Sequence, residues 1–448
     1  MLHFILYNAI ITVQESGEIA MNVKSVFIDG FKNIDRVKIE LNKITALLSP
    51  NNFGKSNLLT AIDFGFQFIQ APREDKVNMM GWKNGFPLNS NEPKDFFEFE
   101  VELEHVIDGE PHTIVYGYTF EWRKTKNFER GIVKENLKVK NDNLSQKLTT
   151  YIDRNFESKK FKTSPTGRCD RDIIADSGLL IVNKLLAYDD LYYLNDVVKP
   201  LNEMNFYLDK HFDTRSSYEV SPIVRRGADD LSLNTNHDIA RVLFKLKQRH
   251  EDKFNLIVNT LKGMFSFIEN INIVESVIKD DTFLMETDEE YPFILSDRFY
   301  TLFAKHTNLV TPINFAEMSD GVKRVLLLLT HIVLAEINHV ILIGIEEPEN
   351  SINPGLLRKY LIVLDNFIDT SKIIITSHSP FLVNYLNPYD IYLGIPNEIG
   401  TASFSRVRKT SIKKLYDEAD HLDMPFGEFL FDLLSGTDED YQVLKRYL

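Results

Sequence analysis

The sequence is poor in cysteine, in long apolar runs and in positive charge, and each lack excludes a class of protein. Cys169 is the only cysteine among 448 residues, which excludes a disulfide scaffold and fits a reducing, cytoplasmic compartment. No segment reaches the roughly 20 apolar residues that a membrane-spanning helix needs. The formal charge of −14, from 51 basic and 65 acidic residues, disfavours broad coating of nucleic acid but leaves local basic patches open.

Several architectural and catalytic patterns are also missing. The chain has no internal repeat, no sustained heptad pattern, no Cys-rich metal cluster, and neither H-E-x-x-H nor G-x-S-x-G, so we expect no long coiled coil, zinc protease or nucleophile elbow. With 44% hydrophobic and 26% charged residues, the composition is that of a globular protein with a sizeable core. The length suits two or three units of roughly 150 residues each.

The first 20 residues stand apart from the rest. Their apolar stretch at 2–13 has no basic region before it and no convincing cleavage site after it, so a signal peptide is not expected. Met21 then opens a pattern typical of a first strand. We expect residues 1–20 to be an upstream extension, the alternative being a genuine extra strand or arm.

Apolar strands and helices alternate along the last third of the chain. Short continuous apolar strands between helices are typical of a parallel sheet covered on both faces. The expected helices are 322–336, 354–367 and 380–386, and the expected strands are 340–345 and 372–376.

The first third predicts further strands, a helix and a meander. We expect strands at 23–28, 37–41 and 43–48, a helix at 57–70 and a loop at 71–95. Apolar residues then occupy every second position in three segments, 97–103, 114–122 and 132–139. Period two with connecting turns predicts an antiparallel β meander.

The middle of the chain has helix-like apolar spacing from 173 to 208, and helices are expected to begin near 239 and 254, with strands at 270–278 and 283–287. Together the patterns predict an α/β fold with a parallel sheet core, an antiparallel β meander and a helical insertion. The expected units are an N-terminal lobe at 21–140, the helical insertion at 141–227, a C-terminal lobe at 228–395 and a C-terminal tail at 396–448.

A phosphate-binding loop is expected between the third strand and the helix that follows. The segment from Ser49 to Ser56 matches G-x-x-x-x-G-K-[ST] except for Ser49 at its first position. The ammonium of Lys55 would neutralise β/γ oxygens of a nucleotide, and the Ser56 hydroxyl would ligate Mg²⁺. Backbone N–H groups at the start of the helix would cradle the phosphates. The binding set is Ser49, Asn51, Asn52, Gly54, Lys55, Ser56 and Asn57; the alternative is a chance Gly-Lys-Ser at a strand–helix junction.

An apolar strand at 341–345 ends in two carboxylates, Glu346 and Glu347. Neighbouring side chains on a strand point to opposite sides, so one carboxylate can face a metal while the next faces the γ-phosphate. We assign Glu346 to Mg²⁺ and Glu347 to polarising the attacking water. The alternative is a strand that merely ends in acidic loop residues.

Two further polar motifs lie at the end of elements. Ser319 and Gly321 open an apolar helix, where N–H groups and a hydroxyl can bind an anion; the alternative is a plain N-cap. His378 follows the strand at 372–376 and could bond a γ-phosphate and orient water; the alternative is a structural histidine.

The order of these four motifs resembles that of the ABC-type ATPase heads of the SMC, RecF and OLD group, over about 21–140 and 228–395. The segment 31–34 looks like the opening strand of that group, and Glu346-Glu347-Pro348-Glu349 is typical of its OLD-like branch. Asn353 stands where that branch often has a histidine. A Q-loop glutamine is not evident, Gln70 being a weak candidate.

The resemblance implies an ABC-type ATPase head that uses ATP and Mg²⁺ and dimerises head to head. ATP would lie between Lys55 and Ser56 of one subunit and Ser319 and Gly321 of the other, and hydrolysis would need Glu347 and His378. A compact build without a long arm looks like that of the ATPase subunits of bacterial anti-phage systems such as Septu and PARIS. This implies a separate effector, such as a nuclease, because too few residues follow 395 for the nuclease domain of an OLD protein.

Two other functions stay open at this point. One is a RecF-like, DNA-binding repair ATPase, and the other is a nucleotide-binding scaffold with negligible turnover. DNA contact would rest on two basic patches, each with the alternative of a solvated or partner-facing surface. The first patch is Arg406, Arg408, Lys409, Lys413 and Lys414, and the second is Lys159, Lys160, Lys162, Arg168 and Arg171, beside Phe156 and Phe161.

Overall fold

The computed structural model describes most of the chain: residues 21–88, 94–124, 131–144, 147–188, 191–209, 216–220, 223–225, 231, 239–278, 293–395, 400–436 and 438–448. The predicted extension at 1–20, the predicted strand at 283–287 and the boundary between residues 227 and 228 lie outside these ranges.

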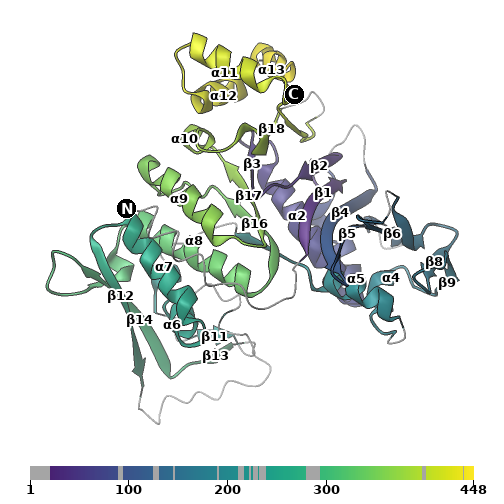
Figure 1. Ribbon diagram of the computed structural model, residues 1–448, viewed down its shortest axis with the longest axis horizontal. Coiled ribbons are helices and arrows are strands. Elements are labelled where there is room, and N and C mark those ends of the chain that lie inside the picture. The colour runs from purple at the N-terminus through teal and green to yellow at the C-terminus, as the bar shows by residue number, and fades with distance from the viewer. Residues whose placement is uncertain are drawn as a thin grey trace.

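A six-stranded sheet lies at the centre of the molecule (Figure 1). Its order is β10-β16-β17-β3-β18-β19, in which the first five strands are parallel and β19 is antiparallel to β18. The strands are β3 (Ile44–Leu48), β10 (Asn205–Asp209), β16 (Val340–Glu346), β17 (Lys372–Ser377), β18 (Ile391–Gly394) and β19 (Phe404–Arg406). Because β16, β17 and β3 are neighbours, the motifs that follow them meet at one carboxyl edge.

Both faces of this sheet are buried, which is why its strands are continuously apolar. On β3, Ala46 and Leu48 belong to one hydrophobic core and Leu47 to the other. The first core is shared with α6 (Ile239–Arg249), α7 (Glu251–Met264), α8 (Asp320–Ile337) and α9 (Pro354–Phe367). The second is shared with α2 (Lys55–Gln70), so α2 covers the opposite face from α8 and α9.

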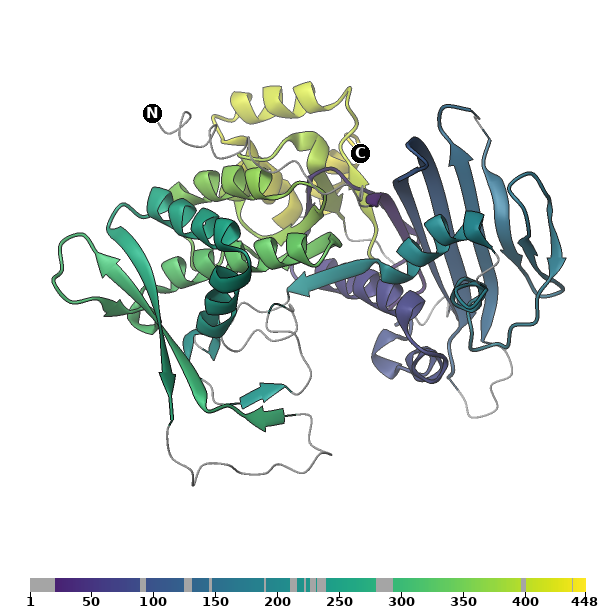
Figure 2. The same cartoon turned by 60° about the horizontal axis from the view of Figure 1, so that its bottom comes forward.

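An eight-stranded antiparallel sheet packs against α2, on the far side of the molecule from the α6–α9 layer (Figure 2). Its order is β2-β1-β4-β5-β6-β7-β8-β9. The meander residues expected to point inward, from Phe97 to Leu103, are fully buried at every second position. Gly65 lets α2 lie close to the sheet, because a Cβ there would be 2.1 Å from the Phe99 ring. Its strands are β1 (Asn22–Asp29), β2 (Val37–Glu40), β4 (Phe96–Ile107), β5 (Glu110–Glu121), β6 (Ile132–Asn141), β7 (Thr149–Arg154), β8 (Lys159–Lys162) and β9 (Cys169–Asp172).

The predicted helical insertion at 141–227 is wrong in large part. Strands β7, β8 and β9 extend the meander, and β10 joins the parallel sheet beside β16. The sequence of β8 is rich in lysine and so lacks the apolar pattern of a strand. The apolar area buried there comes from cross-strand partners such as Ile152 and Phe161. Among the described residues of this range, the helices are α4 (Ile181–Leu185) and α5 (Tyr192–Glu203), with a 3₁₀ turn at Ser216–Tyr218.

The predicted loop at 71–95 is also wrong in part. It contains α3 (Arg73–Met80) and a 3₁₀ turn at Lys83–Gly85. Apolar periodicity does not mark α3, because one of its two buried residues is Lys76. The Lys76 ammonium donates to the carbonyls of Ile69 and Ala71 at the end of α2, a contact that only the folded chain creates.

The remaining elements form a projecting ribbon and a C-terminal cap (Figures 1 and 2). The ribbon consists of β12 (Ile268–Val277) and β14 (Arg298–His306) with β15 (Ile313–Asn314), and β11 (Ile223–Arg225) pairs with β13 (Phe293–Leu295). The cap packs on α10 (Pro380–Val383) and comprises α11 (Ile412–His421), α12 (Phe426–Ser435) and α13 (Asp438–Lys445). Two 3₁₀ turns lie at Phe315–Glu317 and Pro388–Asp390. Within the described ranges, no helix is long and apolar enough to cross a membrane.

Candidate functional site

The phosphate loop lies at the carboxyl edge of the parallel sheet, between β3 and α2. Gly54 caps α2 with a φ of 122°, a backbone conformation that favours glycine. A Cβ at Gly54 would also lie 2.8 Å from the Ala402 Cβ and 3.0 Å from the Asn33 amide. The glycine is therefore required by the protein's own packing as well as by the backbone angle.

Lys55 is buried at the start of α2 and folds back on the loop. Its ammonium donates to the carbonyls of Ser49 at 2.8 Å and Pro50 at 3.2 Å, and to the Ser49 hydroxyl at 3.3 Å. Burial lowers the pKa of Lys55 to about 8, although the carboxylates of Glu347, Glu349 and Glu346 act in the opposite direction. The Ser49 hydroxyl, the departure from the usual glycine, thus holds the lysine. Ser56, next in sequence, is exposed.

A turn after β1 stabilises the phosphate loop through side-chain hydrogen bonds. The Lys32 ammonium donates to the Asn57 amide oxygen at 3.0 Å, and Asn57 donates to the Asn33 amide oxygen at 2.8 Å. Asn33 in turn donates to the Phe53 carbonyl at 3.0 Å. The expected opening strand at 31–34 is wrong, since β1 ends before it and these residues form a turn closed by a bridge between Phe31 and Ile34.

The acidic strand end forms a tight turn after β16. Glu347 adopts a φ of 47°, and its N–H donates to the Thr376 carbonyl of β17 at 2.9 Å. The buried guanidinium of Arg324, from the first turns of α8, donates to the carbonyls of Glu347 at 2.6 Å, Pro348 at 3.3 Å and Glu346 at 3.5 Å. Arg324 therefore ties α8 to the turn that carries both carboxylates. No local signal in the sequence marks Arg324, because an arginine in an apolar helix does not reveal which loop it contacts.

The Glu347 carboxylate lies close to His378. Its Oε1 is 3.6 Å from the His378 Nε2, and its Oε2 accepts from the Asn350 amide at 2.7 Å. Burial, followed by the nearby Lys55 cation, holds the pKa of His378 below its ordinary value. The imidazole is consequently neutral at pH 7.

Glu349 orders the loop after β17. Its Oε1 accepts from the Ser377 hydroxyl at 2.7 Å and from the His378 N–H at 2.9 Å. Its Oε2 is buried, with no hydrogen-bond partner among the described residues. Glu349 belongs to the acidic motif of the sequence, but its role could not be predicted, because it depends on a loop 28 residues away.

The oxygen ligands at this edge suit Mg²⁺, which binds one or two protein oxygens together with substrate phosphates. A hydroxyl at Ser56 and a carboxylate at Glu346 are of the right kind, and the buried Oε2 of Glu349 adds negative charge nearby. Over the part of the chain that the structure describes, no group of three or more His, Cys, Asp or Glu side chains could hold a metal by itself. The donor set thus fits a nucleotide-bound cation rather than an all-protein cage.

Ser319 and Gly321 lie at the exposed start of α8. Ser319 is the N-cap residue, but its side chain makes no capping hydrogen bond. Gly321 touches the Ser351 carbonyl, which a Cβ at Gly321 would approach to 2.7 Å. The first turn of α8 therefore packs on the loop after β16.

Gln70 and Asn353, two residues singled out in the sequence, both lie at the ends of helices. Gln70 ends α2 and donates to the Met204 carbonyl, roughly 22 Å along the helix from Lys55 at 1.5 Å per residue, so it is wrong as a Q-loop glutamine. Asn353 is the N-cap of α9, and its side chain accepts from the Gly355 N–H at 2.9 Å.

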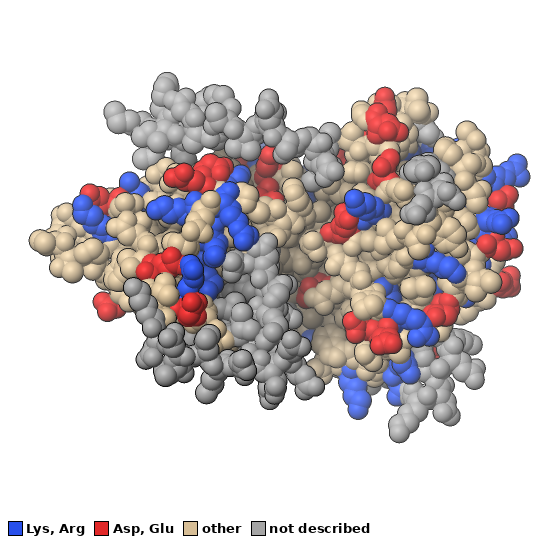
Figure 3. Space-filling model, turned by 90° about the horizontal axis from the view of Figure 1, so that it is seen from below, with Lys and Arg blue, Asp and Glu red and all other residues tan. Residues whose placement is uncertain are grey.

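The two basic patches are only partly available to phosphates. Lys162 is buried, 4.6 Å from the centre of the Tyr151 ring, and Lys159 donates to the Ala175 carbonyl. Arg406 pairs with Glu40 at 2.7 Å. On the face drawn in Figure 3, Lys and Arg are interspersed with Asp and Glu.

Residues 44–384 match the family described as AAA domain, putative AbiEii toxin, Type IV TA system. Three solved structures are similar at low identity and with TM-scores below 0.5. A crystal structure of an SMC head bound to the C-terminal winged-helix domain of ScpA has 13% identity, a TM-score of 0.48 and coverage of 88% of this chain and 99% of that chain.

The second is an SMC head domain from Thermotoga maritima, with 11% identity, a TM-score of 0.42 and coverage of 86% and 99%. The third is an SMC head domain with an extended coiled coil bound to the C-terminal domain of ScpA from Pyrococcus furiosus, with 12% identity, a TM-score of 0.47 and coverage of 89% and 100%. A search of curated proteins found no match.

Proposed function

This chain belongs to the family described as AAA domain, putative AbiEii toxin, Type IV TA system, and from that premise we propose that it is a head-to-head dimerising ATPase that gates a separate effector. It is an ABC-type, SMC-like ATPase of the P-loop class, with an α/β fold of a parallel core and an antiparallel meander. ATP hydrolysis, dimerisation and the gating of an effector are the features that we propose.

One observation carries the proposal. Lys55, Glu347 and His378 come from three different segments and converge at one edge of the sheet, where the Glu347 carboxylate is 3.6 Å from His378 and acts on the pKa of Lys55. A cation, a carboxylate and a neutral imidazole together can bind a phosphoryl group and orient the water that attacks it.

In this proposal the Lys55 ammonium gives up its hydrogen bonds to the loop carbonyls and binds the β/γ oxygens of ATP instead. Ser56 and Glu346 would hold Mg²⁺, the Glu346 carboxylate through water. The chemistry that Mg²⁺ supplies when bound is neutralisation of charge on the β- and γ-phosphates. Loop N–H groups at Ser49, Asn51, Asn52, Gly54 and Asn57 would complete the cradle.

Glu347 would orient and polarise the attacking water. Asn350 holds one carboxylate oxygen at 2.7 Å, which leaves the other facing His378. The neutral His378 would donate a hydrogen bond to the γ-phosphate without adding charge. Arg324, by binding three carbonyls of this turn, is a positioning residue for Glu347.

The second half of the site would come from another subunit. Ser319 is exposed and its hydroxyl makes no capping bond, so it is available to a γ-phosphate presented by a partner. Gly321 N–H would contribute there as well. Two composite sites would then hold two ATP molecules between two heads.

The effector is proposed to be a separate protein, such as a nuclease, in bacterial defence against phage. The family description, which names a toxin and a toxin–antitoxin system, supports a role in which the activity of an effector is held inactive until it is triggered. The alternative is a RecF-like ATPase that binds DNA directly in repair. The engagement of Lys162, Lys159 and Arg406 in contacts within the chain favours the effector.

A mixing experiment tests the composite site. Ser319→Arg should leave ATP binding intact in the monomer but block the partner's γ-phosphate, and Lys55→Ala should remove ATP binding. A mixture of the two variants should recover part of the ATPase rate, because one site in a mixed dimer pairs an intact phosphate loop with an intact signature. A mixture no more active than either variant alone would reject the head-to-head arrangement.

A gel-shift salt titration decides between the two partners. An effector-gating ATPase should bind duplex DNA weakly at all salt concentrations, and should copurify with a second protein in its native host. A steep fall of DNA affinity with salt, reduced by exchange of Arg408 and Lys413 to Gln, would favour the RecF-like function instead.

A further inference from the structure

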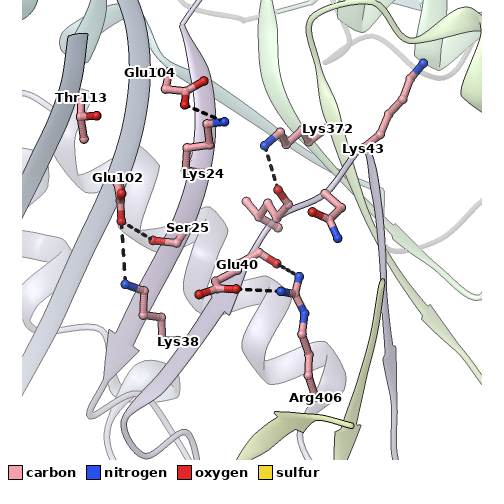
Figure 4. Close-up of a pocket in the computed structure, with 12 residues that line it drawn as sticks. Lys24, Ser25, Lys38, Glu40, Lys43, Glu102, Glu104, Thr113, Lys372 and Arg406 are labelled. Atoms are coloured by element: carbon pink, nitrogen blue, oxygen red, sulfur yellow. Dashed lines mark hydrogen bonds and ion pairs between the residues drawn. The ribbon is translucent and has the colours of Figure 1, made fainter. Parts of the chain in front are cut away.

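A polar cavity lies at the amino edge of the parallel sheet, opposite the edge that carries the phosphate loop (Figure 4). Lys43 precedes β3 and Lys372 begins β17, and the other walls are β1, β2 and β4 of the antiparallel sheet and β19. Its volume is about 500 Å³, within the roughly 300–1,000 Å³ of small-molecule sites.

The lining of this cavity is positively charged although the chain as a whole carries −14. Five cationic side chains and three carboxylates line it, which leaves a surplus of two positive charges. The cations are Lys24, Lys38, Lys43, Lys372 and Arg406, and the carboxylates are Glu40, Glu102 and Glu104.

Each carboxylate has its own cation. The pairs are Glu104 with Lys24 at 2.7 Å, Glu102 with Lys38 at 3.8 Å, and Glu40 with Arg406 at 2.7 Å (Figure 4). Lys43 reaches outward to Asp365 at 3.4 Å, in a pair whose two side chains are about half exposed. Asp365 thus offsets the charge of Lys43 outside the cavity, and Lys372 is the lining cation that has no carboxylate partner among the described residues.

Lys372 is the buried one of the two, with 9% of its surface exposed. Its ammonium donates to the Leu41 carbonyl at 2.8 Å, and among the described residues no carboxylate lies within ion-pair distance of it. An ammonium has three donors, so a buried one with a single acceptor is poorly satisfied. Burial, then repulsion by Lys24, lowers the pKa of Lys372 to about 8, although Glu104 opposes this.

We propose that this cavity binds a phosphorylated small molecule, whose phosphate group lies on the ammonium group of Lys372. A phosphomonoester carries about −1.5 to −2 charges at pH 7, and the buried Lys372 supplies a cation that no carboxylate of the lining pairs with. A volume of about 500 Å³ suits a small ligand better than a duplex. The site is separate from the phosphate loop and does not depend on the proposed ATPase cycle.

The test uses the full-length Lys55→Ala variant, because its phosphate loop no longer competes for phosphate. Isothermal titration with inorganic phosphate and, in a second arm, with adenosine monophosphate shows whether the free anion or the monoester is preferred. Adding Lys372→Met should weaken binding by about tenfold to a hundredfold, as expected for loss of a charged hydrogen bond. Lys359→Met on α9, an exposed lysine outside the cavity, should change nothing.

A proton balance gives an independent readout. At pH 8.5 phosphate binding should take up a proton, because an anion restores the charged form of Lys372; the heat should then vary with the ionisation enthalpy of the buffer. The other charged side chains of the cavity lining are Lys24, Lys38, Lys43, Arg406, Glu40, Glu102 and Glu104. The uptake should vanish in Lys372→Met.

Three results would overturn the proposal. One is that neither phosphate nor the monoester binds the Lys55→Ala protein at millimolar concentration. Another is that a folded Lys372→Met variant binds as tightly as its parent; if that variant is unfolded by circular dichroism, absence of proton uptake by the Lys55→Ala protein at pH 8.5 overturns the proposal instead. The third is that Lys372→Met weakens binding of duplex DNA but of no small phosphate, which would make the cavity part of a nucleic-acid surface.

Discussion

Replacement of Glu347 by glutamine separates ATP binding from hydrolysis. Glutamine keeps the length and the acceptor oxygen that Asn350 contacts at 2.7 Å, but it cannot polarise water as a carboxylate does. The side chain is 40% exposed, so we expect a change in the free energy of unfolding within about 0.5 kcal/mol, as for most surface substitutions. The folded site should therefore remain intact.

The chemical step should be slowed by roughly 10²–10⁴-fold, the usual contribution of a general base, which is about 2.7–5.4 kcal/mol in activation free energy. ATP should still bind, since Lys55, Ser56 and Glu346 are unchanged. Glu347 is the carboxylate that most opposes the low pKa of Lys55. Its loss lowers that pKa further, so the assay belongs at pH 7 or below, where more of the ammonium is retained than at higher pH.

Single-turnover hydrolysis of radiolabelled ATP measures the chemical step, and size-exclusion chromatography with and without ATP measures the dimer. We expect slow turnover together with accumulation of an ATP-bound dimer. Glu428→Gln on α12, an exposed carboxylate outside the site, is the matched control and should behave as the unmodified protein.

Normal turnover of Glu347→Gln would refute the assignment of Glu347 as the base. Loss of ATP binding that added Mg²⁺ cannot restore would instead make Glu347 the metal carboxylate, and the roles of Glu346 and Glu347 would have to be exchanged.

Four further predictions concern the same site. Lys55→Ala should abolish ATP binding in isothermal titration, because the β/γ oxygens lose their cation. In the unmodified protein, ATP affinity should fall and proton uptake should rise as the pH passes from 7 to 9, since the pKa of Lys55 is about 8 and the free protein loses the ammonium above it. Gly54→Ala should lower the free energy of unfolding by about 1–3 kcal/mol, measured by thermal melting, because the φ of 122° and the 2.8 Å approach to Ala402 leave no room for a methyl group. Arg324→Met should lower the free energy of unfolding by about 1.5–3 kcal/mol and should change kcat more than KM. Arg324→Lys should recover part of kcat. A purely structural role would instead change kcat and KM in the same proportion.

The sequence by itself determined the elements whose signals are local. The apolar runs at 43–48, 340–345 and 372–376 predicted strands, and the structure contains β3, β16 and β17 there. Alternation at Phe97, Phe99, Val101 and Leu103 identified the inward face of β4, because period two in a half-buried strand needs no knowledge of the partner strand. The phosphate loop, too, is contiguous, so its residue types and spacing are visible in the chain.

The tertiary structure alone decided which residues support these elements. Strands β8 and β10 exist because of pairing with β7 and β16, and a charged or short segment carries no periodic signal of such pairing. Arg324, Asn33 and Glu349 act on loops that are distant in sequence, at 23, 20 and 28 residues' separation.

The amino-edge cavity has the same origin. Lys372 is an ordinary strand-start lysine in the sequence, and it became a buried cation only when β1 and β4 closed over the ends of β3 and β17. Hydrogen bonding and desolvation depend on what lies within a few ångströms in space, and one-dimensional spacing records only what lies nearby along the chain.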